Sequence, residues 1–164
     1  MVQHLVHGLK FEDQIRFGPW LGRWAVTALN SVEHPTWTAV VPIPLHPIRH
    51  MQRGYNQLDG FCRTLARGLG VAYWPQAMRK RTTWALLFGA QSGRSKRARL
   101  KRQINPFFLP PITRKKLAGR PWLRILLVDD VVTTGATLRH ALEAWAEIPG
   151  VVVDVYTISV GRDY

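Results

Sequence analysis

Residues 125–138 combine a short apolar run, two adjacent carboxylates and a small-residue turn, in the order Ile-Leu-Leu-Val-Asp-Asp-Val-Val-Thr-Thr-Gly-Ala-Thr-Leu. The four apolar residues predict a buried strand, and the residues after the turn predict a helix. A strand over 124–128, a helix over 136–146 and a strand over 151–159 would form a β-α-β unit with a right-handed crossover. We therefore expect an α/β fold built on a parallel sheet.

The residues between this strand and helix have the chemistry of a sugar phosphate site. Asp129 and Asp130 would lie at the carboxyl edge of the sheet, where open α/β sheets bind ligands, and their oxygens can accept hydroxyl protons. The next loop exposes backbone N–H groups at the positive end of a helix dipole, which favours an anion. Glycine there permits a positive φ or a close approach to the ligand. The loop residues are Thr133, Thr134, Gly135, Ala136 and Thr137.

Other families also end an apolar strand in two aspartates. Nucleotide hydrolases do so, but they need an upstream phosphate loop that ends in Gly-Lys, and the chain contains no Gly-Lys pair. A phosphoacceptor receiver domain would need more chain after Asp130 than is present. A strand, a solvated turn and a capped helix without any ligand is the remaining alternative.

The segment 125–138 resembles the phosphoribosyl pyrophosphate (PRPP) loop of type I phosphoribosyltransferases. Residues 40–49 (Val-Val-Pro-Ile-Pro-Leu-His-Pro-Ile-Arg) and 53–57 (Arg-Gly-Tyr-Asn-Gln) are similar to the ComF/GntX group of that superfamily. The similarity extends to residues 9–11 and 99–105, and so covers nearly the whole chain.

This resemblance implies a Rossmann-like parallel sheet and a role for each motif. Asp129 and Asp130 would be catalytic, because they would hold the ribose hydroxyls and stabilise positive charge on the ribose. Residues 133–137 would bind the 5′-phosphate. Arg49 and Arg53 would bind the pyrophosphate, together with a magnesium ion that the substrate carries, since a guanidinium binds phosphate oxygens two at a time. We expect no metal site made by the protein itself.

The implied reaction is transfer of a 5-phosphoribosyl group to a nitrogen nucleophile with release of pyrophosphate. No base pocket is evident in the sequence, so the acceptor stays open. The alternative is an accessory protein in competence or DNA uptake that senses PRPP or a nucleotide without turnover, or that binds DNA. Members of this group usually begin with a four-cysteine zinc segment, and this chain has only Cys62, which rules out a thiolate cage.

The charge of the chain is unevenly distributed. No acid occurs between Asp59 and Asp129, whereas that stretch contains sixteen of the 23 Lys and Arg residues. We expect residues 75–121 to form a basic hood or lid over PRPP with little regular structure of its own. The basic region 79–124 could instead bind single-stranded DNA through its phosphates, or be a solvated loop.

The remaining expectations concern the whole chain. Residues 1–164 fit one domain, no stretch is apolar enough to span a membrane, and we expect a cytoplasmic protein. Nothing in the sequence indicates an oligomeric state. Further predicted elements are helix 3–30, interrupted near Gly18-Pro19, strand 38–43, helix 55–69, and strand 71–73 beside the first strand. Apolar positions of the first helix, including Trp20 and Trp24, are expected in the core.

Overall fold

The computed structural model describes residues 14–33, 35–45, 51, 54–81, 105–120 and 122–161. Its elements, in chain order, are α2 (Gln14–Asn30), β1 (Ala39–Pro42), α4 (Asp59–Gly68), β2 (Ala72–Tyr73), β3 (Arg79–Lys80), β4 (Phe107–Phe108), α6 (Pro111–Leu117), β5 (Leu123–Val132), α7 (Ala136–Ala146) and β6 (Val151–Val160).

A four-stranded parallel sheet forms the centre of the molecule. Its strand order is β2-β1-β5-β6, and each neighbouring pair is parallel. The strand at 71–73 does pair beside the first strand, as predicted. The α/β class and the Rossmann-like parallel sheet are thereby confirmed.

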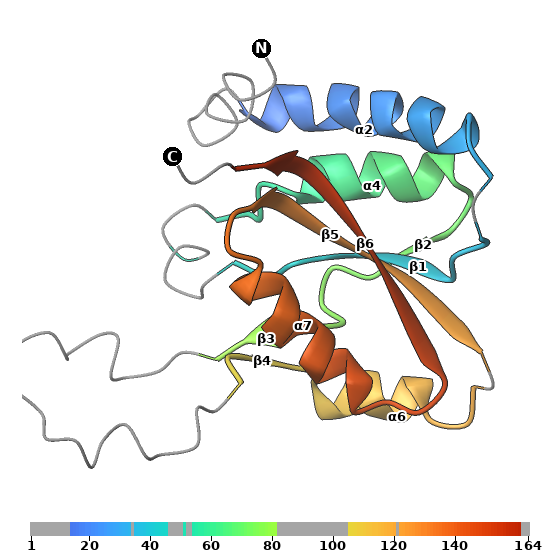
Figure 1. The fold of residues 1–164 in the computed structure, drawn as a ribbon, viewed down its shortest axis with the longest axis vertical. Helices are drawn as coiled ribbons and strands as arrows, with labels where there is room; N and C mark the ends of the chain where they lie inside the picture. The colour runs from blue at the N-terminus through green and yellow to red at the C-terminus, as the bar shows by residue number, and fades with distance from the viewer. Residues whose placement is uncertain are drawn as a thin grey trace, which may run out of the picture.

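Helices cover both faces of the sheet (Figure 1). Alternate residues of β5 explain why two cores form, because successive side chains of a strand point to opposite faces. Leu126 and Val128 pack with Phe61 and its neighbours under α2 and α4. Ile125 and Leu127 pack with Trp145 of α7 and with the segment around α6 on the other face.

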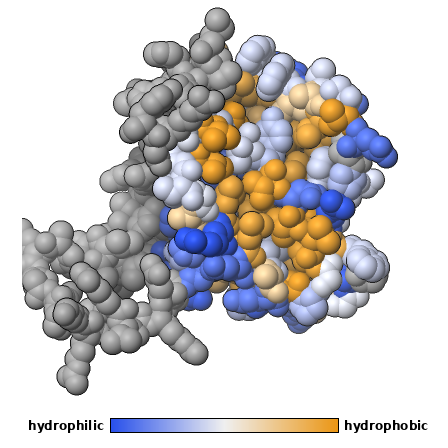
Figure 2. All heavy atoms as spheres, viewed as in Figure 1, coloured by the Kyte–Doolittle hydropathy of each residue, from blue (hydrophilic) through white to orange (hydrophobic). Residues whose placement is uncertain are grey.

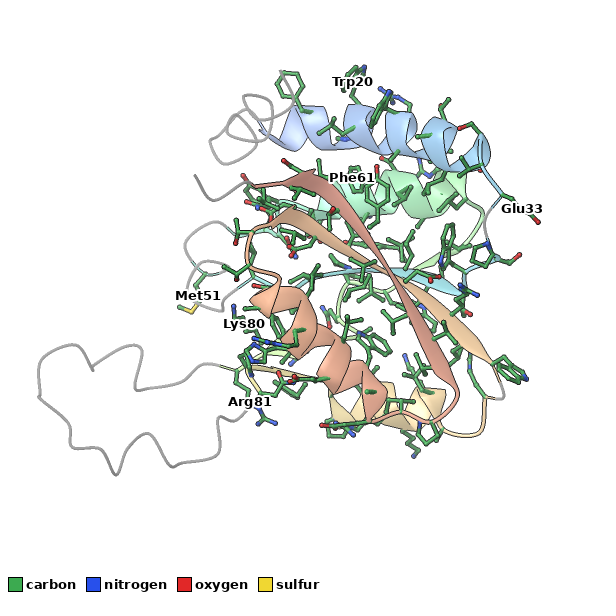
Figure 3. The ribbon with its side chains drawn as sticks, in the orientation of Figure 1. Trp20, Glu33, Met51, Phe61, Lys80 and Arg81 are labelled. Atoms are coloured by element: carbon green, nitrogen blue, oxygen red, sulfur yellow. The ribbon has the colours of Figure 1, made fainter. Side chains whose placement is uncertain are left out.

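The predicted interruption of the first helix at Gly18-Pro19 is wrong, because α2 runs through Pro19 to Asn30. The helix packs closely against α4 at this point, since a Cβ at Gly18 would lie 3.1 Å from the backbone N of Phe61. Two residues expected in the core are also on the outside, since Trp20 is 52% and Trp24 is 63% exposed. Figure 3 shows Trp20 on the side of α2 away from the sheet.

The expectation of little regular structure over 75–121 is also wrong for the part that the structure describes. Strands β3 and β4 pair antiparallel there, and α6 follows them. The segment contributes to the core because Met78, Phe107, Leu109 and Leu117 are buried in the cluster around α7. Residues 82–104 and Pro121, with most of the predicted hood, lie outside the described residues.

Candidate ligand-binding site at the carboxyl edge of the sheet

The carboxyl ends of β1 and β5 lie side by side and define one edge of the sheet (Figure 1). The backbone N of Ile43, just after β1, donates a hydrogen bond of 2.8 Å to the carbonyl of Val128. Strand β5 continues past the predicted end at 128, because Asp129, Val131 and Val132 still pair with β6. The two aspartates are thus the last polar residues inside a strand, and not the first residues of a loop.

Asp129 and Asp130 are neighbours whose side chains point to opposite faces of the sheet. Each carboxylate folds back on the next residue: Asp129 Oδ1 accepts from the backbone N of Asp130 at 2.9 Å, and Asp130 Oδ1 accepts from that of Val131 at 2.9 Å. Asp129 is 6% exposed, whereas Asp130 is partly exposed. The pair therefore fixes two carboxylates at one edge, with one of them buried.

Burial, and next the negative charge of Asp130, raise the pKa of Asp129 to about 7. The hydrogen bond from the backbone of Asp130 and the positive charge of Lys80 act in the opposite sense. Because its pKa lies near neutrality, this carboxyl can change its protonation state close to physiological pH.

The segment before α4 positions the carboxylate of Asp130. Gln57 donates a hydrogen bond from Nε2 to Asp130 Oδ2. Asn56 is buried and holds this segment against β1, because its Nδ2 donates to the carbonyl of Ile43 at 3.1 Å and its Oδ1 accepts from the backbone N of Leu58 at 3.1 Å. The predicted helix began at residue 55. These contacts explain why α4 begins at Asp59 instead.

The loop between β5 and α7 has the geometry of an anion site. Gly135 is the N-cap residue of α7 and takes the left-handed conformation, with φ 72°, so the N-cap position itself supplies no side-chain hydrogen bond to the helix. The hydroxyl of Thr134 accepts a 3.4 Å hydrogen bond from the backbone N of Ala136, while Thr133 and Thr137 are exposed. The first turn of α7 contains no acid, so its positive dipole end is not neutralised from within the helix.

The structure brings some of the predicted site residues together and separates others. Asp129 and the loop 133–137 line one hollow, which continues to Leu138. Asp130 does not line this hollow, because its side chain lies on the face with Gln57. Arg49 and Arg53, predicted to bind pyrophosphate, lie outside the described residues.

A larger cavity of about 500 Å³ adjoins the carboxyl ends of β1 and β2. Three cationic side chains line it, Arg63, Arg79 and Lys80, together with one carboxylate, that of Asp59. Tyr73 donates its hydroxyl to Asp59 Oδ1 at 2.6 Å, and burial raises the pKa of Tyr73 above its usual range. Figure 3 shows Lys80 on the same side of the molecule as the start of α7.

No individual role was predicted for Gln57, Asn56 or Arg63, and the lining residues Arg79 and Lys80 were predicted only as part of the basic region. Gln57 and Asn56 belong to the motif 53–57, so the motif itself was the available signal. Lys80 could not have been identified as a neighbour of Asp129, because the two residues are far apart in sequence and meet only in the folded chain.

Two kinds of feature are absent from the part of the chain that the structure describes. Within the described ranges, no three or more His, Cys, Asp or Glu side chains lie together as a metal site would require. In the same part of the chain, no helix has the length and apolar character needed to cross a membrane.

Comparison with known proteins identifies relatives among competence and DNA utilization proteins, although no protein-family model matches the chain. The DNA utilization protein YhgH of Salmonella typhi is 32% identical over 160 residues, which cover 94% of this chain and 65% of that protein. Competence protein F of Haemophilus influenzae is 30% identical over 140 residues, covering 83% and 58%. Competence protein ComFC of Streptococcus pneumoniae is 32% identical over 123 residues, covering 74% and 47%.

The chain thus spans no more than about two thirds of the length of these relatives. The three relatives carry related names and all match over most of this chain. The chain belongs to the ComF family of competence and DNA utilization proteins.

Proposed function

We propose that this chain binds PRPP at the carboxyl edge of its sheet and transfers the 5-phosphoribosyl group to a nitrogen nucleophile. One observation carries the proposal: a buried carboxylate, Asp129, lines the same hollow as a helix N-terminus whose N-cap residue is a left-handed glycine. A carboxylate suits sugar hydroxyls and a helix N-terminus suits a phosphate, and PRPP carries both groups on one ribose.

The proposed orientation follows from the positions of these groups. The 5′-phosphate would accept hydrogen bonds from the backbone of residues 133–137, and the ribose hydroxyls would donate to Asp129 or Asp130. The pyrophosphate would then extend toward the cationic cavity lined by Arg63, Arg79 and Lys80. Magnesium would arrive with the pyrophosphate, because the ion is usually held by one or two carboxylates plus substrate phosphates, and two carboxylates are present here.

The proposed reaction replaces one bond at the anomeric carbon. The bond from that carbon to the pyrophosphate oxygen breaks, the bond to the acceptor nitrogen forms, and the nitrogen loses a proton to solvent or to a nearby base. Positive charge develops on the ribose during this step, and the carboxylates of Asp129 and Asp130 would stabilise it. Loss of one such charge-stabilising contact typically costs about 2.7–4 kcal/mol of activation free energy.

A second function is supported by the names of the relatives and by the charge of the chain. The relatives are called competence and DNA utilization proteins, and the chain has a net charge of +13. A non-catalytic role in DNA uptake, with PRPP or a nucleotide as a signal, would use the same ligand site without an acceptor.

The experiment that tests PRPP binding is calorimetric titration with PRPP and magnesium, comparing two variants that lose the same charge. Asp130→Asn should weaken binding by about tenfold or more, since a hydrogen bond to a charged group contributes about 1.5–3 kcal/mol. Glu33→Gln should bind like the unchanged protein, because Glu33 is exposed and precedes β1 at the opposite end of the sheet, as Figure 3 shows. Equal binding by both variants would remove Asp130 from the site, and absence of PRPP binding by the unchanged protein would refute the proposal.

A measurement of turnover distinguishes the proposed transferase from the non-catalytic role. Pyrophosphate release should be measured with a panel of purines, pyrimidines and small amines. Release with one acceptor supports transfer, whereas tight PRPP binding without release across the panel supports the non-catalytic role.

A further inference from the structure

A second cavity, of about 700 Å³, is lined by residues 73–79, which follow β2, and by residues 110–120 around α6. All of its lining residues belong to the described part of the chain. Its volume lies in the range of pockets that hold small-molecule ligands. Neither Asp129, Asp130 nor the loop 133–137 lines it, so this second cavity is separate from the hollow proposed to hold the ribose and the 5′-phosphate.

The lining of the second cavity contains three cations and no acid. The cations are Arg79 of β3, Lys116 of α6 and Arg120, and all three are exposed. None of them makes an ion pair within the described part of the chain, whereas the nearby Arg114 is paired with Glu147. Figure 2, drawn in the view of Figure 1, shows hydrophilic residues over β3 and along the lower rim of the molecule, where α6 lies. Three such cations around one cavity favour an anion with more than one charge, as a phosphate monoester has.

Trp74 gives the second cavity an aromatic surface. The residue is half-buried, and it packs against the buried cluster that contains the lining residues Ala77 and Leu117. Its backbone N donates a hydrogen bond of 3.0 Å to the carbonyl of Val40, and its carbonyl accepts one of 3.3 Å from the backbone N of Ala77. Trp74 is therefore fixed in place, and an indole fixed beside a cavity suits the stacking of a planar ring.

Two neutral polar side chains also line the second cavity. Thr113 is buried in α6, and Gln76 is exposed in the segment after β2. A hydroxyl and an amide can each donate and accept hydrogen bonds, and the edge of a nucleobase offers both kinds of partner. A sugar phosphate would use only the cations and these polar groups, whereas a nucleotide would use Trp74 as well.

We propose that the second cavity binds a nucleoside 5′-monophosphate, with its base against Trp74 and its phosphate on Arg79, Lys116 and Arg120. This site does not depend on the proposed PRPP site, because PRPP has no base to stack and the loop 133–137 does not line the cavity. Arg79 also lines the cavity of about 500 Å³ proposed for the pyrophosphate, so the two ligands would lie next to each other. Trp74 and Lys116 line only the second cavity and are the residues that test it.

Calorimetric titration of the full chain with AMP tests the proposal. AMP should bind about tenfold or more tightly than adenosine or ribose 5-phosphate, because each of these uses only part of the lining. Trp74→Leu should weaken AMP binding by about fivefold to hundredfold, the factor that stacking of a base on an aromatic side chain contributes. The matched control is Trp122→Leu, at a residue that is 82% exposed and does not line the cavity. It should bind AMP like the unchanged chain.

Lys116→Gln tests the same cavity at an exposed residue, so its result does not depend on how the core tolerates the loss of an indole. It should weaken AMP binding by about threefold to tenfold and leave adenosine binding unchanged. Lys115→Gln removes the same charge from the preceding exposed residue of α6, which does not line the cavity, and should bind AMP normally. Gly135→Ala should also retain AMP binding.

Four results would overturn the proposal. Equal weakening by the two lysine variants would mean that AMP responds only to net charge. Loss of AMP binding in Gly135→Ala, with normal binding in Lys116→Gln, would place AMP at the loop 133–137. Equal affinity for AMP and ribose 5-phosphate would show that the base makes no contact. Binding of a 5′-phosphorylated deoxyadenylate hexamer through Trp74, without binding of AMP, would assign the cavity to the end of a strand and not to a free nucleotide.

Discussion

Asp129 is held in a position that disfavours its negative charge. The residue is buried, and the carboxylate of the adjacent Asp130 lies close enough to raise its pKa to about 7. Such an arrangement reduces the stability of the folded chain when Asp129 is ionised, because an unfolded aspartate ionises near pH 3.9 at no such cost.

Asp129 should make the free energy of unfolding change with pH in the opposite direction to that caused by an ordinary salt-bridged aspartate. Between pH 4 and pH 7 the folded state holds a proton that the unfolded state has lost, so the free energy of unfolding falls as pH rises through this window. The fall between pH 5 and pH 8 should be about 2–3 kcal/mol, since one pKa unit corresponds to about 1.4 kcal/mol. Urea denaturation at several pH values measures it.

The matched variants assign the effect to this carboxyl. Asp129→Asn cannot ionise, so its free energy of unfolding should fall much less between pH 5 and pH 8 than that of the unchanged chain. Glu33→Gln, at an exposed position, should retain the full pH dependence. If Asp129→Asn retained it as well, another group would be responsible.

For single residues, the sequence pattern predicted which residue types lie at the carboxyl edge of the sheet. It did not predict to which face of the sheet each side chain points. The two aspartates and the loop 133–137 were identified because acids and small hydroxyl residues after an apolar run have few other uses. The prediction ended the strand at 128, and so missed that Asp129 and Asp130 continue it and point to opposite faces. The contact between Gln57 and Asp130 joins residues 73 positions apart, which local patterns cannot specify.

The two helices on one face of the sheet pack through glycines. A Cβ on Gly22 of α2 would lie 2.8 Å from Thr64 Cβ and 2.9 Å from the carbonyl oxygen of Phe61, both in α4. The absence of side chains at this contact allows the two helices to lie close together.

Adding a methyl group at this contact should therefore destabilise the fold. Gly22→Ala should lower the free energy of unfolding by about 1–3 kcal/mol, because overpacking outweighs the gain in helix propensity. Gly60→Ala, in α4, is the matched control: its Cβ would meet Pro19 Cδ at an ordinary 3.4 Å, so its melting temperature should stay level or rise. Thermal unfolding followed by circular dichroism distinguishes the two, and a stable Gly22→Ala variant would contradict the packing argument.

The loop before α7 allows the conformational role of a glycine to be separated from its role in binding. Gly135 and Gly70 have φ values of 72° and 68°, and neither would bring a Cβ within 4 Å of another atom. Alanine at either position should cost about 1–2 kcal/mol of stability, because the left-handed conformation is unfavourable for a residue with a Cβ. Only Gly135→Ala should also weaken PRPP binding in calorimetry, since Gly70 lies between α4 and β2 at the other end of the sheet. Equal PRPP affinity of the two variants would exclude the loop from the site.

Elements with a strong periodic pattern were predicted well, and elements fixed by tertiary contacts were not. Helix 136–146 is confirmed at both ends, and the strand at 151–159 is one residue longer. Strands β3 and β4 have two residues each and exist because they pair with each other across a long separation in sequence. Their apolar residues are too few to form a pattern, so the region appeared to be an irregular hood.

The whole molecule divides its chemistry between distinct surfaces. The carboxyl edge of the sheet contains the aspartates and the loop 133–137, strand β6 is uncharged except for Asp154, and basic residues are concentrated between Asp59 and Asp129 in the sequence. PRPP would use the carboxyl edge and the cationic cavity beside it, whereas DNA would need other basic residues such as Lys115 and Lys116, so the two functions can be tested separately.

Single-stranded DNA should bind to the basic residues with an affinity that falls steeply with salt, because each neutralised phosphate contributes about −0.7 to the slope of log K against log salt. Lys115 and Lys116 are exposed at the end of α6, within the region 79–124 for which DNA binding was the alternative to a lid. Replacing both by Gln should reduce the size of that slope by about 1.4 if both contact phosphates.

The control replaces Arg23 and Arg67, two exposed cations of α2 and α4, and removes the same charge. Fluorescence anisotropy at several salt concentrations measures both variants. Equal slopes for the two would mean that DNA responds only to net charge, whereas a change confined to the lysine variant places DNA on the α6 side of the molecule.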